Sequence, residues 1–141
     1  MASLLATSCD VLPGSSNPTP VATLSPVAVG KLDPQVAMPG GFPADLPVYP
    51  TARLVAAASF ASGNKTTWGM EWETLDLAAK VQAFYVARLN QGDWKVVFGG
   101  AGADGAYSAV ISRQSDSAVT GILAINSVSG VTKITLSLVT H

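Results

Sequence analysis

The sequence has very few of the side chains that carry most enzyme chemistry. It holds one cysteine, Cys9, one histidine, His141, and only 12% of its 141 residues are charged. A lone cysteine excludes an internal disulfide, and together with one histidine it falls short of the three or four ligands of a zinc site. A hydrolytic triad needs an imidazole held in position, which a chain terminus rarely provides. These shortages argue against a hydrolase or a zinc enzyme.

The low charge also limits the kinds of partner. The charged share is about half the usual share of a soluble domain, and the net charge of −1 gives no electrostatic reason to expect a nucleic acid. The longest apolar stretches fall short of the roughly 20 residues that a membrane-spanning helix needs. The hydrophobic content of 48% is enough for one domain with a real core.

Cys9 stands at the end of a short apolar run, Leu4-Leu5-Ala6-Thr7-Ser8-Cys9. This run resembles the lipobox of bacterial lipoproteins, in which cleavage precedes a cysteine that then carries lipid. It departs from the usual pattern at Ala6, where leucine is common, and no basic residue precedes the cysteine. A signal peptide needs a basic region and 7–15 apolar residues, so Met1 is interpreted as an internal methionine of a longer signal peptide. The alternative is a cytoplasmic protein with an incidental cysteine.

The composition of residues 10–41 predicts a linker. They contain six of the nine prolines, no aromatic residue and only three charges. Proline removes backbone donors and fixes φ, so neither a helix nor a paired strand is expected over most of this segment. The predicted organisation is therefore a truncated signal or lipobox segment at 1–9, a Pro/Ser/Thr-rich extended linker at 10–41 and a folded domain at 42–141.

The folded domain is predicted to be α+β. Residues 42–50 carry regularly spaced prolines and are expected to dock irregularly on the core through their apolar side chains. Alternation of apolar and polar residues predicts strands, and apolar residues at helical spacing predict a helix over 77–91, with Asp76 as its N-cap and Gly92 as its stop. The order ββαββββ implies one antiparallel sheet with the helix across one face. The expected strands are 53–62, 65–74, 94–98, 107–113, 119–128 and 131–140.

Residues 42–98 resemble small domains of secreted and lipid-anchored bacterial proteins. The resemblance rests on Pro47-Val48-Tyr49-Pro50-Thr51-Ala52, followed by Phe84-Tyr85, Leu89 and Gly92-Asp93-Trp94. Such domains are largely uncharacterised, so the resemblance implies a location and a fold and supplies no catalytic residue.

Two short patterns suggest chemistry only weakly. Gly100 to Gly105 matches the G-x-G-x-x-G string of dinucleotide sites, but that mechanism needs a helix at the third glycine, and strand periodicity follows instead. Glu71 and Glu73 could form an acid and base pair near Asp76. Two carboxylates on one strand face are more often plain surface charges.

The aromatic residues are the remaining candidates. On one sheet face beneath the helix they would build the core. The alternative is a partly open groove for a lipid, a glycan or a partner chain, with Arg88 at its polar edge. The candidate ligand or partner surface consists of Trp68, Trp72, Phe84, Tyr85, Arg88 and Trp94.

The sequence therefore favours a non-enzymatic lipoprotein, anchored through lipid on Cys9 in the periplasm or at the cell surface. Its expected role is an accessory or scaffold subunit of a membrane-associated complex, with a protein partner, no nucleic acid and no cofactor. The alternative is a soluble or tethered ligand-binding module that uses the aromatic face for a lipid, a glycan or a peptide.

Overall fold

The predicted order of elements is confirmed. The structure is a computed structural model that describes residues 30–141, so Cys9 and most of the expected linker lie outside the described residues. In the described part, six antiparallel strands form one sheet in the order β1-β2-β6-β5-β4-β3. The elements are β1 (Arg53–Ser62), β2 (Lys65–Thr74), α1 (Ala78–Leu89), β3 (Trp94–Phe98), β4 (Tyr107–Arg113), β5 (Thr120–Val128) and β6 (Val131–Thr140).

Tight turns set the register of the two hairpins. β1 and β2 are joined at Gly63 and Asn64, with φ +61° at the glycine. β5 and β6 are joined by Ser129 and Gly130, both with positive φ (51° and 77°). Two positive φ values are the mark of the type I′ turn, whose twist matches that of antiparallel strands. The hairpin predicted at Ser129-Gly130 is therefore confirmed.

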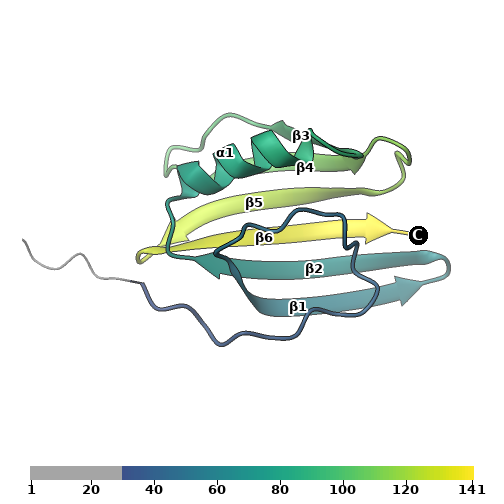
Figure 1. Cartoon of the computed structure of the whole chain (residues 1–141), viewed down its shortest axis with the longest axis horizontal. Helices are drawn as coiled ribbons and strands as arrows, with labels where there is room; N and C mark the ends of the chain where they lie inside the picture. The colour runs from purple at the N-terminus through teal and green to yellow at the C-terminus, as the bar shows by residue number, and fades with distance from the viewer. Residues whose placement is uncertain (1–29) are drawn as a thin grey trace, which may run out of the picture.

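Residues 30–141 cover the sheet on one face only, which we call the inner face. Figure 1 shows α1 lying in front of the β3 and β4 half of the sheet, and the N-terminal segment crossing in front of the other half. The packing agrees with this view, because α1 contacts β3 and β5, and the ring of Phe42 packs edge-on against Trp68 at 5.6 Å. The opposite face, here called the outer face, has no such layer among residues 30–141.

The core follows from strict alternation along the strands. Side chains of a strand alternate between the two faces, and the inner positions of β6 are Ile134, Leu136 and Leu138, each at most 1% exposed. Across the neighbouring strands, Ile125 lies opposite Ile134 and Leu123 opposite Leu136. The predicted inward face of β6 is confirmed.

The helix begins differently from the prediction. α1 spans Ala78–Leu89, and its N-cap is Leu77, which makes no side-chain cap hydrogen bond. Asp76 was the predicted N-cap, and this prediction is wrong. Its carboxylate instead accepts hydrogen bonds from the side chains of Tyr49, Thr51 and Lys80, so side chains occupy it in place of a backbone N–H of the helix.

The last part of the expected linker belongs to the folded unit. The backbone N–H of Asp33 donates to the Glu73 carboxylate at 2.8 Å, and the N–H of Val36 donates to the carbonyl of Leu54 at 2.8 Å. Residues 30–41 therefore pack against the sheet as a continuation of the 42–52 segment. That segment docks as predicted, with Leu46 and Tyr49 buried.

We expect a matched pair of truncations on neighbouring strands to measure how one-sided the core is. Ile134 is fully buried on the inner face, and Ile122 is 57% exposed on the outer face. Ile134→Ala should lower the free energy of unfolding by about 2–5 kcal/mol, whereas Ile122→Ala should change it by less than about 0.5 kcal/mol. Urea denaturation of both variants measures this, and equal losses would contradict an open outer face.

Candidate functional site

Most of the expected aromatic surface lies in the core. Trp68, Trp72, Tyr85 and Trp94 are between 1% and 4% exposed. The reason is their position: the three tryptophans occupy inner-face positions of β2 and β3, and Tyr85 lies on the side of α1 that faces the sheet. Four of the six candidate residues are thus core residues and do not form an open surface.

The other two candidates reach the surface of α1. The Phe84 ring packs edge-on against Tyr49 and Tyr85, with both ring centroids 5.2 Å away. Arg88 is exposed in the last helical turn, where a cation interacts favourably with the helix dipole. Beside Phe84 there is an open cavity of about 390 Å³. Its lining consists of Tyr49, Pro50, Thr51, Asp76, Lys80 and Phe84.

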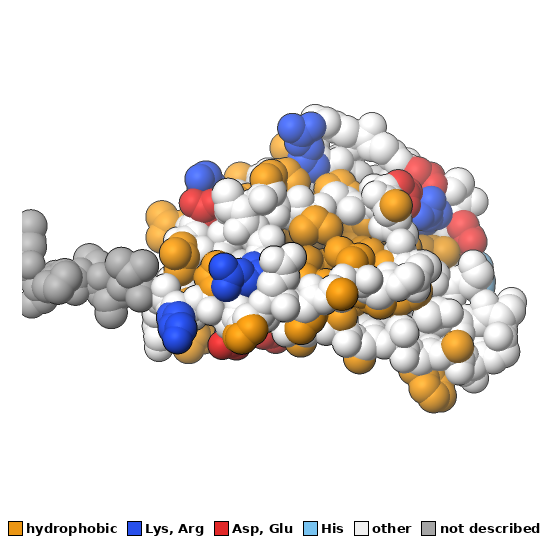
Figure 2. Space-filling view, turned by 60° about the horizontal axis from the view of Figure 1, so that its bottom comes forward, with side chains coloured by type: hydrophobic (Ala, Val, Ile, Leu, Met, Phe, Trp, Pro, Cys, Tyr) orange, Lys and Arg blue, Asp and Glu red, His pale blue; other side chains and the backbone are white. Residues whose placement is uncertain are grey.

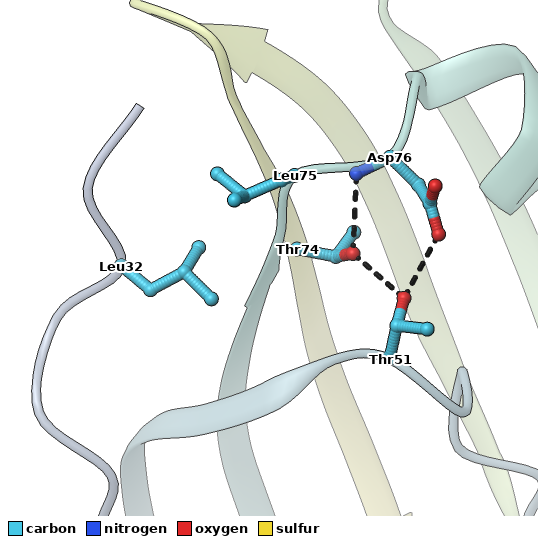
Figure 3. Close-up of a pocket in the computed structure, with 5 residues that line it drawn as sticks. All are labelled: Leu32, Thr51, Thr74, Leu75 and Asp76. Atoms are coloured by element: carbon cyan, nitrogen blue, oxygen red, sulfur yellow. Dashed lines mark hydrogen bonds between the residues drawn. The ribbon is translucent and has the colours of Figure 1, made fainter. Parts of the chain in front are cut away.

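Asp76 is a meeting point of three segments. Its carboxylate accepts hydrogen bonds from the Tyr49 hydroxyl at 2.8 Å, the Thr51 hydroxyl at 2.9 Å and the Lys80 ammonium at 3.0 Å. Figure 3 shows Asp76 with Thr51 and Thr74 beside a cavity of about 250 Å³, whose lining is completed by the apolar side chains of Leu32 and Leu75. The cluster ties the N-terminal segment to the junction between β2 and α1.

These contacts shift the pKa values of Asp76 and Tyr49. Hydrogen bonds from Lys80, Tyr49 and Thr51 hold the pKa of Asp76 below its usual range. Burial and the adjacent carboxylate raise the pKa of Tyr49. At neutral pH the carboxyl is therefore charged and the phenol neutral, which is the pairing that the hydrogen bonds require, and neither group is poised to exchange a proton.

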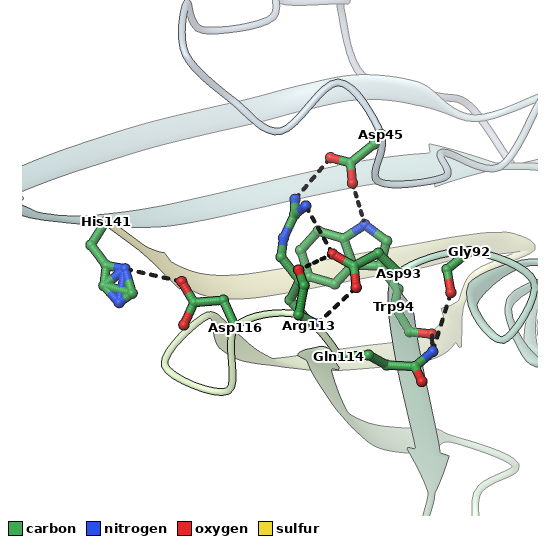
Figure 4. A network of polar contacts seen from close by, with 9 residues as sticks. Asp45, Gly92, Asp93, Trp94, Arg113, Gln114, Asp116 and His141 are labelled. Carbon is green, nitrogen blue, oxygen red and sulfur yellow. Dashed lines mark hydrogen bonds and ion pairs between the residues drawn. The ribbon is translucent and has the colours of Figure 1, made fainter.

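A second polar network surrounds Arg113 at the other end of the inner face (Figure 4). Its guanidinium lies 4.6 Å from the Trp94 ring centroid and contacts Asp45 at 2.9 Å and Asp93 at 3.3 Å. The indole N–H of Trp94 donates to the same Asp45 carboxylate at 3.1 Å. The cation is thus shared between two carboxylates and an aromatic face. The hydrogen bond that Arg113 donates to Asp45 raises the pKa of the guanidinium further.

The groups around this network are also paired. Asp93 accepts hydrogen bonds from the Ser115 hydroxyl and, at 2.8 Å, from the Ser115 backbone N–H. The Ser115 hydroxyl, followed by its N–H and Arg113, lowers the pKa of Asp93. His141 lies with its Nδ1 3.5 Å from the Asp116 carboxylate. The open cavity of about 410 Å³ next to them therefore contains a serine, a histidine and carboxylates, but the serine contacts Asp93 and the histidine contacts Asp116, so no nucleophile and base are joined.

Glu73 differs from the prediction for the outer face of β2. It was expected as a surface charge beside Glu71, yet it is only 2% exposed. Lys133 contacts both carboxylates, at 3.0 Å for Glu71 and 3.1 Å for Glu73. Burial by itself would raise the pKa of Glu73, but the N–H of Asp33 and the ammonium of Lys133 outweigh it, and the pKa lies below its usual range. Glu73 is therefore a buried, charged residue that joins β2 to the N-terminal segment and to β6.

The glycine-rich stretch is a loop between two strands. It leads from β3 into β4, so no helix N-terminus faces it and the dinucleotide mechanism does not apply. Hydrogen bonds within the loop fix its shape: the Gly102 N–H donates to the Ala106 carbonyl at 2.8 Å, and the Asp104 carboxylate accepts the Ala106 N–H at 3.1 Å. An open cavity of about 500 Å³ lies between this loop and the ends of β4 and β5.

The outer face carries an exposed apolar row. Val97 lies opposite Val110, and Val110 lies opposite Ile122, so the three side chains are neighbours on adjacent strands. Each is 55–57% exposed. Charges are few over the whole molecule. Figure 2, in which the β1 edge of the sheet and not the outer face is turned forward, shows hydrophobic side chains across the middle of the view and small clusters of acidic and basic groups, one of them beside the histidine.

Sequence reasoning missed the polar networks and gave only a partial indication of the apolar row. Asp45, Asp93 and Arg113 are far apart in the chain and carry no local pattern that links them. The sequence does indicate the part of the row on β5. Residues 119–128 are apolar at both alternating sets of positions, which is typical of a central strand with a hydrophobic outer side.

Comparisons with models of protein families, with curated proteins and with solved structures found no match for this chain. Residues 30–141 include no helix that is both long and apolar enough to span a membrane. Within the same residues, no group of three His, Cys, Asp or Glu side chains is placed to hold a metal ion.

The lowered pKa of Glu73 predicts a specific pH dependence of stability. A folded pKa below the unfolded value of about 4.3 contributes stability above that value, and this contribution is lost as the pH falls through the folded pKa. Glu73→Gln should therefore lower the unfolding free energy by about 1–3 kcal/mol at neutral pH, and its deficit should shrink below about pH 4.

Denaturant titrations across pH measure this deficit. Glu71→Gln is the control, because it removes a carboxylate that contacts the same lysine from a more exposed position. A deficit for Glu73→Gln that is constant with pH, or no larger than that of the control, would contradict the assignment.

Proposed function

We propose that this chain is a non-enzymatic bacterial lipoprotein, anchored through Cys9 outside the cytoplasm, whose domain acts as an accessory or scaffold subunit of a membrane-associated complex. The observation that carries the proposal is the outer face of the sheet. An antiparallel sheet that meets water on one side usually shows polar residues there, whereas this one presents the row Val97, Val110 and Ile122.

The chemistry around this row favours a protein partner. The row lies on three adjacent strands. Its neighbours on the same face are the small, uncharged Ser112, Thr120 and Ala124 and, beside Val97, the exposed Lys95. Hydrogen-bonded strands fix the positions of these side chains, so a complementary surface can pack against them with little loss of side-chain entropy. Exposed apolar patches of this kind mark interaction surfaces on soluble domains.

The polar residues support a non-enzymatic role. The carboxylates of Asp45, Asp76 and Asp93 and the cation of Arg113 are each held by partners from another segment. No buried side-chain nitrogen or oxygen of residues 30–141 lacks a hydrogen-bond partner. A catalytic site usually keeps a group with a perturbed pKa free to react, whereas these groups are committed to joining segments of the fold.

The anchor is supported by the sequence around Cys9 and by where the folded unit begins. Gly30 lies against the turn between β5 and β6, so about twenty residues separate the domain from Cys9. Fully extended, they would span up to about 70 Å. A tether of this length would let a lipid-anchored domain reach a membrane-embedded or surface-attached partner.

A ligand-binding module is the second candidate. The cavity beside Phe84 and the cavity beside the glycine-rich loop favour it, because both combine apolar walls with a few hydroxyl or amide groups. Saturable binding of a lipid, glycan or peptide by the purified chain, lost on Phe84→Ala or on Asn126→Ala, would favour this function over the subunit.

We expect a photo-crosslinking residue at position 122 to identify the partner surface. In membranes of the native host it should give one protein adduct of discrete mass, and Val97→Lys should abolish this adduct because it places a charge in the same row. A crosslinker at Lys80, on the opposite side of the sheet, is the control. Adducts only to lipid, or an adduct that Val97→Lys leaves unchanged, would contradict the proposed surface.

The anchor makes an independent prediction. Mass spectrometry of the native protein should find Cys9 as the first residue, with a diacylglyceryl group on its sulfur, and Cys9→Ser should move the protein out of the membrane fraction. A native chain that starts at Met1 with a free thiol would exclude lipidation.

A further inference from the structure

The two edge strands of the sheet, β1 and β3, are protected to different degrees. An edge strand presents unpaired backbone N–H and C=O groups, and natural proteins shield such edges with short strands, charges, prolines, bulges or covering segments. β3 has three of these devices. It has five residues, it includes Lys95, and the Asn90 side chain accepts the backbone N–H of Val96 at 3.2 Å.

The first residues of β1 are protected as well. The register with β2 shifts between Leu54 and Ala56, which is a bulge, and the N–H of Val36 donates to the Leu54 carbonyl on the open side of the strand. From Ala56 onward no other segment of residues 30–141 makes a backbone hydrogen bond to this side. We call Ala56–Ser62 the free edge of β1.

The free edge lacks the charges and prolines that discourage strand pairing. Its sequence is Ala-Ala-Ala-Ser-Phe-Ala-Ser, which contains no charge and no proline, and all seven residues are exposed. The side chains other than phenylalanine are small, so they allow another backbone to approach closely. The contrast with β3 and with the start of β1 indicates that this edge is left open for a partner strand.

Phe60 and Ala58 make the free edge complementary to itself. Both lie on the outer face, because Phe60 is opposite Thr67 and Ala58 is opposite Gly69. Phe60 is 71% exposed, and a side chain added at Gly69 would meet nothing within 4 Å. A large exposed ring therefore stands two residues from a shallow depression formed by Ala58 and Gly69.

We propose that the free edge of β1 pairs antiparallel with the same edge of a second copy of this chain. Two identical strands pair in this way about a two-fold axis, and an isologous contact of this kind closes at a dimer. With the axis at Ser59, Phe60 of each copy lies opposite Ala58 of the other, and its ring covers the depression at Gly69. The two sheets then form one continuous sheet.

This inference does not rest on the proposed function. It uses the β1 side of the sheet, whereas the proposed partner surface lies on β3, β4 and β5. A dimer would place two such surfaces on one assembly, but dimerisation itself is a property of the purified chain. It can hold or fail whatever the anchor and the partner are.

The test is the mass of the purified full chain in solution, measured by light scattering over a range of concentrations. We expect a species of twice the 14.4 kDa chain mass. Ser59→Lys should weaken dimerisation by about tenfold or more, because it sets two ammonium groups opposite each other at the axis. Ser117→Lys, which adds the same charge at an exposed turn, should leave the dimer intact. Circular dichroism and thermal melting establish that both variants are folded.

A cysteine crosslink tests the register separately. In a Cys9→Ser background, Ser59→Cys should form a disulfide-linked dimer under mild oxidation, because the two positions meet at the axis, and Ser117→Cys at an exposed turn should not. A chain that is monomeric at all concentrations would overturn the proposal. So would a dimer that Ser59→Lys leaves intact, or crosslinking equal at positions 59 and 117.

Discussion

The fold depends on covering the inner face of a six-stranded sheet with very little material. Strands spaced about 4.8 Å apart make a sheet about 24 Å wide, whereas a helix is about 10 Å across, and residues 30–141 contain a single helix of twelve residues. α1 therefore covers only one half of the apolar surface. The N-terminal segment must cover the other half, and Leu46, Tyr49 and Phe42 pack there.

The few charged residues hold this irregular cover in place. A segment without regular secondary structure has no internal hydrogen-bond ladder, so its position depends on contacts with other elements. Asp45 connects it to Trp94 and Arg113, Tyr49 connects it to Asp76, and the Asp33 backbone connects it to Glu73. These contacts engage Asp45, Tyr49, Asp76, Glu73 and Arg113 in holding the segment to the sheet.

The other side of the sheet has no covering layer among residues 30–141. The outer face has the apolar row across β3, β4 and β5, and the free edge of β1 lies at the far side of the sheet. Both are exposed where a monomeric domain would ordinarily be shielded by charge or by another layer. The two surfaces are separate, so the domain could bind a different protein through one and a second copy through the other.

The sequence by itself determined the strands, the helix and their order, because period-two and helical spacing are local patterns that only one kind of backbone satisfies. It also determined the hairpin at Ser129-Gly130, where backbone conformation follows from two neighbouring residues. Only the tertiary structure decided the burial and the hydrogen-bond partners of Glu73, Asp76 and the aromatic side chains. Glu73 is buried because Asp33 and Lys133 reach it, and Asp76 bonds to the Tyr49 hydroxyl where an N-cap would bond to a backbone N–H. Each outcome depends on a partner more than twenty residues away along the chain, and local spacing carries no record of such partners.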